Sequence, residues 1–200
     1  MGGRIRQYLA AVILVAAMTT TGPATASVET AAQFVDRFGN QAIDALAAPG
    51  VTDRNREAVV RSLLRRGLDL AFIGRFVLGK HWARATPAQR GDYLALFEGY
   101  VVKVYTAWFA RNSGGRLTVV GAKQVNDKDV VVRTRIERIN DPPIIVEWRV
   151  RAINGYDRII DIASNGISLA GTQRLEFDSV IKRNGMDGLI GFLRKRAVAP

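Results

Sequence analysis

The feature that most constrains this chain is a change in its hydrophobic period near the middle of the sequence. Up to about residue 111, apolar residues recur three or four positions apart, the spacing of an amphipathic helix. After the glycine pair at 114–115 they alternate with polar residues, as in a strand with one buried face. The helical spacing returns near the C-terminus. We therefore expect an α+β fold in which a run of strands lies between two groups of helices.

The N-terminal half predicts three helices. The first spans residues 29–47 and ends at Ala-Ala-Pro-Gly, and the second begins near Asp53 and continues through Phe72 toward Val77. The third begins at Thr86, where Thr-Pro-Ala-Gln combines an N-cap residue, a first-turn proline and a capping-box glutamine. Residues 79–85, which include His81 and Trp82, are predicted to form the turn before it.

Four strands are predicted after the glycine pair, followed by two helices. Asn-Asp, Asn-Asp-Pro-Pro and Asn-Gly separate the strands and favour antiparallel hairpins. The alternate positions carry charged side chains such as Arg133 and Glu147, so one face of the sheet is expected to be solvated. A helix from Ser168 and a short basic helix after Asn184-Gly185 complete the chain. The apolar positions of the strands fall within 117–121, 130–136, 144–150 and 156–162.

The first 26 residues have the pattern of a cleavable signal peptide. Two arginines precede the unbroken apolar run Tyr8–Met18, and Ala24-Thr25-Ala26 supplies small residues for cleavage. The run is shorter than the roughly 18 residues of a membrane-spanning helix, and an uncleaved anchor is the alternative. We expect cleavage after Ala26, a single domain over residues 27–200 and a periplasmic location. The chain has no cysteine, so its core must stabilise it without disulfides.

The charge of the chain narrows the range of partners. The formal net charge is +11, and loss of residues 1–26 would leave 27 basic and 18 acidic residues, a net charge of +9. The basic residues are spread along the whole sequence without a nucleic-acid-binding module, so we expect no nucleic-acid partner. An anionic lipid surface or an acidic partner is the better match for this charge.

The sequence offers little for catalysis. His81 is the only histidine and there is no cysteine, which excludes a metal site built on those residues. The chain also has no G-x-S-x-G elbow, no G-x-G-x-x-G motif and no P-loop. We therefore predict no catalytic residue, no metal and no cofactor. A small exported hydrolase that uses His81 is the alternative, and it would require His81→Ala to abolish hydrolysis without disturbing the fold.

Four segments together resemble a known family. Residues 72–109, FIGRFVLGKHWARATPAQRGDYLALFEGYVVKVYTAWF, resemble the signature of the MlaC family. RTRIERINDPPIIVEWRVR, YDRIIDIASNGISLAGTQRLEF and VIKRNGMDGLIGFLRKR resemble its later segments in the same order. The resemblance covers roughly residues 30–196. MlaC proteins are the periplasmic phospholipid-binding components of the Mla lipid-transport system.

The resemblance implies a lipid carrier that is not an enzyme. Its fold would be a four-stranded antiparallel sheet packed by helices around an apolar lipid cavity. Its partners would be phospholipid, an outer-membrane lipoprotein-porin complex and an inner-membrane ABC transporter complex of the Mla type. A related branch is associated with hopanoid biosynthesis, so a hopanoid-type lipid is an alternative cargo. The apolar wall implied for the cavity comprises Phe76, Phe97, Val101, Val104, Tyr105, Val132, Ile136, Val146, Trp148, Ile160 and Ile162.

Overall fold

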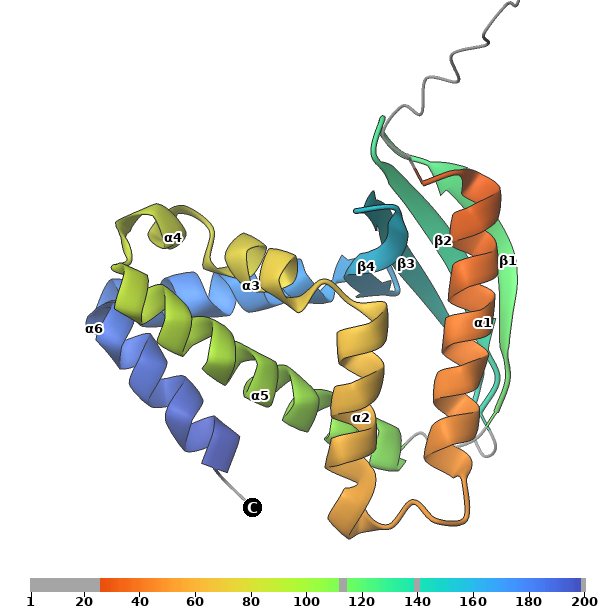
Figure 1. Ribbon diagram of the computed structural model, residues 1–200, viewed down its shortest axis with the longest axis horizontal. Helices are drawn as coiled ribbons and strands as arrows, with labels where there is room; N and C mark the ends of the chain where they lie inside the picture. The colour runs from red at the N-terminus through yellow and green to blue at the C-terminus, as the bar shows by residue number, and fades with distance from the viewer. Residues whose placement is uncertain (1–25, 112–114, 139–140, 199–200) are drawn as a thin grey trace, which may run out of the picture.

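The computed structural model describes residues 26–111, 115–138 and 141–198 (Figure 1). All but the last residue of the predicted signal peptide lie outside these ranges. The described helices are α1 (Val28–Ala47), α2 (Asp53–Gly67), α3 (Leu70–Leu78), α4 (Lys80–Arg84), α5 (Pro87–Arg111) and α6 (Leu169–Val198). The described strands are β1 (Leu117–Gln124), β2 (Asp129–Ile136), β3 (Ile144–Ile153), β4 (Tyr156–Ser164) and β5 (Ile167–Ser168).

The strands form one antiparallel sheet in the order β1-β2-β3-β4-β5, which confirms the predicted α+β fold. Two-residue turns join the last three strands. Asn154 and Asn165 have φ values of 52° and 50°, and each precedes a glycine with positive φ, the geometry that two-residue hairpins favour. The fifth strand was not predicted, because two residues are too few to show an alternating pattern.

The second predicted helix is wrong in one respect, because it is broken into α2 and α3. Leu68 forms a parallel bridge to Ile159 of β4, and the amide of Asp69 donates to the carbonyl of Ile159 at 3.0 Å. The side chain of Asp69 then accepts from the amide of Phe72 at 2.8 Å and caps α3. Pairing with the sheet therefore outweighs the helical pattern of the sequence at this point.

The segment before α5 is also more regular than predicted. Residues 80–84 form the short helix α4 rather than a turn, after Gly79 at a φ of 56°. The predicted start of α5 is confirmed: the amide of Gln89 donates to Thr86 Oγ1 at 3.2 Å, and the amide of Thr86 donates to Gln89 Oε1 at 3.0 Å. In α6, Gly185 has a φ of 69° and separates the two predicted C-terminal helices.

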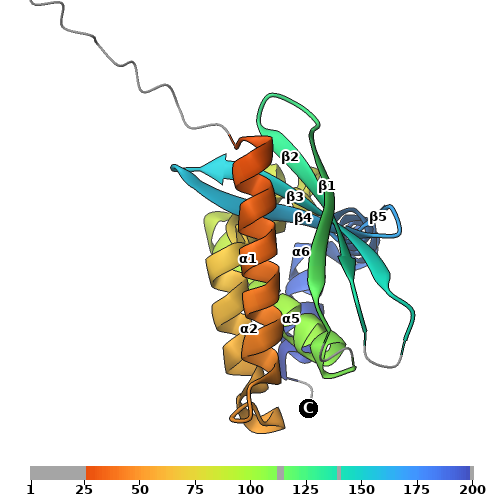
Figure 2. The ribbon, with the colours of Figure 1, turned by 90° about the vertical axis from the view of Figure 1, so that its right-hand side faces the viewer.

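The helices lie to one side of the sheet (Figures 1 and 2). At one end α1 packs directly on the sheet through small side chains such as Ala31 and Val35, which meet Val130 and Val150. At the other end Phe177 of α6 packs against the ring of Tyr93 in α5. Aromatic pairs of this kind contribute about 0.5–1.5 kcal/mol each beyond burial. The contact of α1 with the sheet and the contact of α5 with α6 are therefore both closely packed.

One acidic side chain of the sheet is fully buried. Asp129 accepts hydrogen bonds from Arg149 at 2.7 Å, Arg151 at 2.6 Å and Asn126 at 3.0 Å. Burial acts to raise the pKa of Asp129, but the hydrogen bonds from Arg151, Asn126 and Arg149 outweigh it and lower that pKa to about 2. This carboxylate ties the β2 end of the Asn126 turn to β3.

We expect Asp129→Asn to lower the free energy of unfolding by about 1.5–3 kcal/mol at pH 7, the range for hydrogen bonds to a charged group. Because the pKa of Asp129 is depressed in the folded state, its contribution is complete above the unfolded value near 3.8 and is lost as the pH falls through about 2. Urea unfolding of both proteins at several pH values measures this difference. Asp127→Asn, an exposed change in the same turn, is the control and should be neutral. An Asp129→Asn deficit that stayed constant down to pH 2 would contradict the assignment.

Candidate functional site

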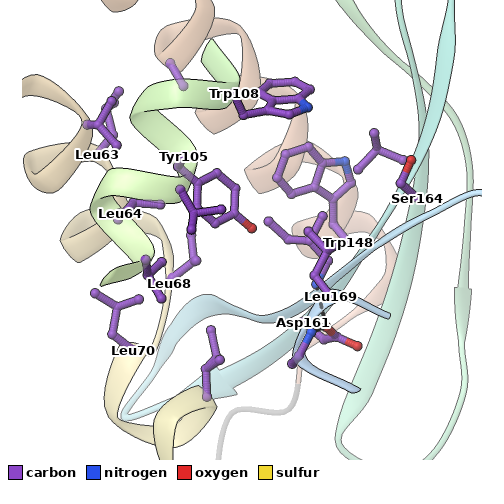
Figure 3. Close-up of a pocket in the computed structure, with 18 of the residues that line it drawn as sticks. Leu63, Leu64, Leu68, Leu70, Tyr105, Trp108, Trp148, Asp161, Ser164 and Leu169 are labelled. Atoms are coloured by element: carbon purple, nitrogen blue, oxygen red, sulfur yellow. Dashed lines mark hydrogen bonds between the residues drawn. The ribbon is translucent and has the colours of Figure 1, made fainter. Parts of the chain in front are cut away.

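A cavity of about 400 Å³ lies between the helices and the sheet (Figure 3). Its wall takes residues from α1, α2, α3, α5 and α6 and from strands β1 to β4. Nearly all of the lining side chains are aliphatic or aromatic. Among the described residues that line it, only Asp161 carries a formal charge. The site is therefore suited to a ligand that is mainly apolar.

The helical side of the wall follows from amphipathic spacing. In α2, Val60, Leu63 and Leu64 are buried, and all three line the cavity. In α5, Val101 and Tyr105 are four residues apart and therefore share one face of the helix. Figure 3 shows Leu63, Leu64 and Leu68 on one side of the space and Trp148 on the other, with Tyr105 projecting between them.

The sheet side of the wall follows from strand alternation. Trp148 of β3 lies opposite Ile162 of β4, and Val146 lies opposite Ser164, so all four are on one face. A hydroxyl on the same face fixes the indole, because Thr134 of β2 lies opposite Val146. Trp148 Nε1 donates to Thr134 Oγ1 at 2.8 Å, and Thr134 Oγ1 donates to the carbonyl of Val146 at 3.1 Å. Thr134 is fully buried, so this small network holds Trp148 against the cavity without exposing a polar group to it.

The polar corner of the cavity is formed by Asp161. Its carboxylate accepts from the amide of Ile162 at 2.9 Å, the hydroxyl of Ser168 at 2.6 Å and the amide of Ala170 at 3.2 Å. Burial raises the pKa of Tyr105, and the negative charge of Asp161 raises it further. Tyr105 is thus a neutral phenol at any physiological pH. The corner combines this phenol with a carboxylate that already holds the start of α6.

Eight of the eleven residues predicted for the wall line the cavity. They come from α5 and from three adjacent strands, which the sequence pattern alone does not bring together. The eight are Phe97, Val101, Val104, Tyr105, Ile136, Val146, Trp148 and Ile162.

The structure places the other three predicted residues outside the wall. Phe76 is 40% exposed on α3, with the guanidinium of Arg174 over its ring at 5.1 Å. Val132 is fully buried, but in the cluster beneath α1, because that helix covers this end of the sheet. Ile160 sits at a β-bulge, where Arg149 pairs with Asp161 and the next residue of β3 pairs with Ile159. The bulge leaves Ile160 without a partner in the register and breaks the alternation on which the prediction depended.

The sequence prediction missed the contribution of α1 and α2. Their apolar stripes were visible at helical spacing, but such stripes also form ordinary cores, and nothing in the spacing distinguishes the two. It also missed Asp161, because a carboxylate next to a bulge has no sequence signal of its own. The missed residues of α1 and α2 are Phe38, Gly39, Ala42, Ile43, Leu46, Val60, Leu63 and Leu64.

His81 lies away from the cavity and makes a tertiary contact. Its Nε2 is 2.7 Å from Asp178 Oδ1, so it joins α4 to α6. Lys182, at 2.6 Å from the same carboxylate, and His81 lower the pKa of Asp178 through hydrogen bonds. Over the described ranges, no three acidic or histidine side chains are grouped to bind a metal ion. None of the helices described is long and apolar enough to cross a membrane.

We expect Thr134→Val to lower the free energy of unfolding by about 1–3 kcal/mol, because the indole N–H of Trp148 loses its buried acceptor. Urea unfolding measures this difference. Thr134→Ser keeps the hydroxyl and should recover most of the loss. Thr118→Val, at an exposed position of β1, is the control. Equal stability of Thr134→Val and the unmodified protein would show that the hydroxyl does not hold Trp148.

The fold and the sequence both match known proteins. The fold is similar to that of a phospholipid-binding protein from Ralstonia solanacearum, whose structure was solved in complex with a phospholipid. The two chains are 24% identical, the match covers 84% of this chain and 96% of that one, and the TM-score is 0.74. The profile of the MlaC protein family matches residues 36–195. Because that match spans most of the sequence and agrees with the four motif segments, this chain belongs to the MlaC family.

Proposed function

We propose that this protein is a periplasmic lipid carrier that holds phospholipid acyl chains in its cavity. The observation that carries the proposal is the cavity itself, about 400 Å³ in volume and lined almost wholly by apolar side chains. The phospholipid held by the similar Ralstonia solanacearum protein supports the same class of cargo. In this proposal the carrier shuttles lipid between an outer-membrane lipoprotein-porin complex and an inner-membrane ABC transporter complex of the Mla type.

Energetics explain why such a carrier is needed. At about 0.8 kcal/mol per buried methylene, two chains of about 16 carbons represent on the order of 25 kcal/mol of transfer free energy from water. A lipid therefore does not cross an aqueous space unaided at a useful rate. A protein interior that offers comparable apolar contacts makes the exchange between membrane and carrier nearly neutral.

The same energetics bear on the protein without its cargo. At about 24 cal/mol per Å³, a closed void of about 400 Å³ would cost on the order of 10 kcal/mol, as much as the whole stability of a typical domain. We therefore expect the cavity to be filled by lipid in the native protein, or to shrink when the lipid is stripped.

The periplasmic location rests on the N-terminal sequence. Cleavage after Ala26 would make Ser27 the first residue, and Ser27 is the N-cap of α1, with its hydroxyl accepting from the amide of Thr30 at 3.0 Å. The proposed cleavage would thus leave the first helix intact.

The proposal includes no catalytic step. His81 has a structural role in it, because its contact with Asp178 joins α4 to α6.

Solvent extraction of natively purified protein, followed by lipid mass spectrometry, tests the proposal. We expect near-stoichiometric phospholipid. A hopanoid-type lipid in its place would correct the cargo and keep the carrier function. Absence of bound lipid, together with no uptake from phospholipid vesicles, would rule out a carrier.

We expect Val146→Glu to reduce bound phospholipid severalfold, because it places a carboxylate in the apolar wall. Val120→Glu introduces the same charge at a position 52% exposed on β1 and should leave the lipid content unchanged. Lipid mass spectrometry and thermal unfolding are measured on the same samples.

If Val146→Glu does not fold, Ile162→Trp serves instead, since it fills the cavity without adding charge. The lipid content should fall further than the melting temperature in either variant. Unchanged lipid content in a folded variant would mean that these residues are ordinary core.

A further inference from the structure

Two residues that line the cavity are also open to solvent. Val104 of α5 is 48% exposed and Leu169, the first residue of α6, is 44% exposed. Ile167, two residues before Leu169, is 63% exposed. Isolated exposed apolar residues are common on proteins. Val104 and Leu169 differ because they also line the cavity, which places them where it opens to solvent. Ile167 lies beside this opening, because it pairs with Ser164, which lines the cavity, and directly opposite residues of an antiparallel pair share one face of the sheet.

The backbone holds Ile167 and Leu169 outward. The turn Asn165-Gly166 directs the chain back along β4, where Ile167 pairs with Ser164 and Ser168 with Ala163. The hydroxyl of Ser168 then donates to Asp161 at 2.6 Å.

The amide of Ala170 also donates to Asp161, at 3.2 Å, and the side chain of Ala170 is buried. Since Ser168 and Ala170 are both tied to the same carboxylate, the alternate positions 167 and 169 are left facing solvent. The exposure of the two apolar side chains is therefore built into the fold.

We propose that Ile167 and Leu169, together with Val104, form an apolar rim that shields the acyl chain of a phospholipid as it passes between the cavity and a bilayer. The inference rests on the proposed function and adds the route that the lipid takes. Ile167, which lies outside the cavity lining, acts on the rate of transfer, because it contacts the chain after the chain has left the cavity wall. The amount of lipid bound at equilibrium depends on the cavity instead.

The size of the effect follows from the hydration of methylene groups. Each methylene kept out of water at the barrier changes the rate by about fourfold. A side chain the size of isoleucine covers one or two such groups. We therefore expect removal of its apolar surface to slow transfer by roughly fourfold to fifteenfold.

Ile167→Thr tests the rim, because threonine keeps the β-branched shape that suits a strand and removes the apolar end. The probe is a fluorescent phosphatidylethanolamine, taken up from vesicles of phosphatidylethanolamine and phosphatidylglycerol. We expect slower uptake at the same final amount of bound lipid. Ile167→Leu retains an apolar side chain and should keep the original rate. Leu175→Thr is the matched control, since Leu175 is 74% exposed on α6 but, unlike Ile167, is not paired with a residue that lines the cavity.

The outcomes separate the two proposals. If Ile167→Thr takes up lipid as fast as the unmodified protein, the rim does not guide the chain, and a protein partner becomes the better occupant of this surface. Equal slowing by Leu175→Thr would also overturn the inference, because any exposed leucine would then act alike. No uptake by the unmodified protein would instead contradict the carrier function itself.

Discussion

The side of β4 that faces away from β3 is the constraint on which the rest of this structure depends. At one end of the edge, Ile159 pairs with Leu68 and fixes the junction between α2 and α3. At the other end, Asp161 and β5 fix the start of α6. Two helical groups are thus attached to the same strand at separate points. Because neither group can slide onto the sheet without breaking the hydrogen bonds that Ile159 and Asp161 accept, the space between them stays open.

The molecule combines this open centre with closely packed ends. Beneath α1, small side chains allow the helix to approach the sheet closely. Between α5 and α6, the ring of Phe177 meets those of Tyr93, Phe97 and Tyr100 at centroid distances of 6.3, 6.4 and 5.9 Å. These regions contain tightly packed contacts of the kind that a stable core requires. The apolar surface around the cavity can therefore remain incompletely packed, which a ligand-binding interior needs.

The sequence predicted the elements better than the spaces between them. Helix starts such as Thr86-Pro87 and turns such as Asn154-Gly155 are encoded locally, and the structure has both. The break at Leu68 was missed because its cause is a bond to Ile159, a residue distant in the sequence. The bulge at Ile160 likewise depends on pairing with β3. The alternating pattern therefore predicted Ile160 in the cavity wall and did not predict Asp161 there. Periodicity shows which faces of the helices and strands are apolar. It does not show where two apolar faces leave a cavity between them.

The cavity wall is built from residues that are far apart in the sequence. Its residues range from Phe38 near one end of the described chain to Gln173 near the other, and contacts of such large sequence separation form late and slowly. A chain truncated before α6 lacks the residues that form one side of the cavity wall. A complete apolar cavity therefore forms only when the C-terminal helix has joined the rest of the fold.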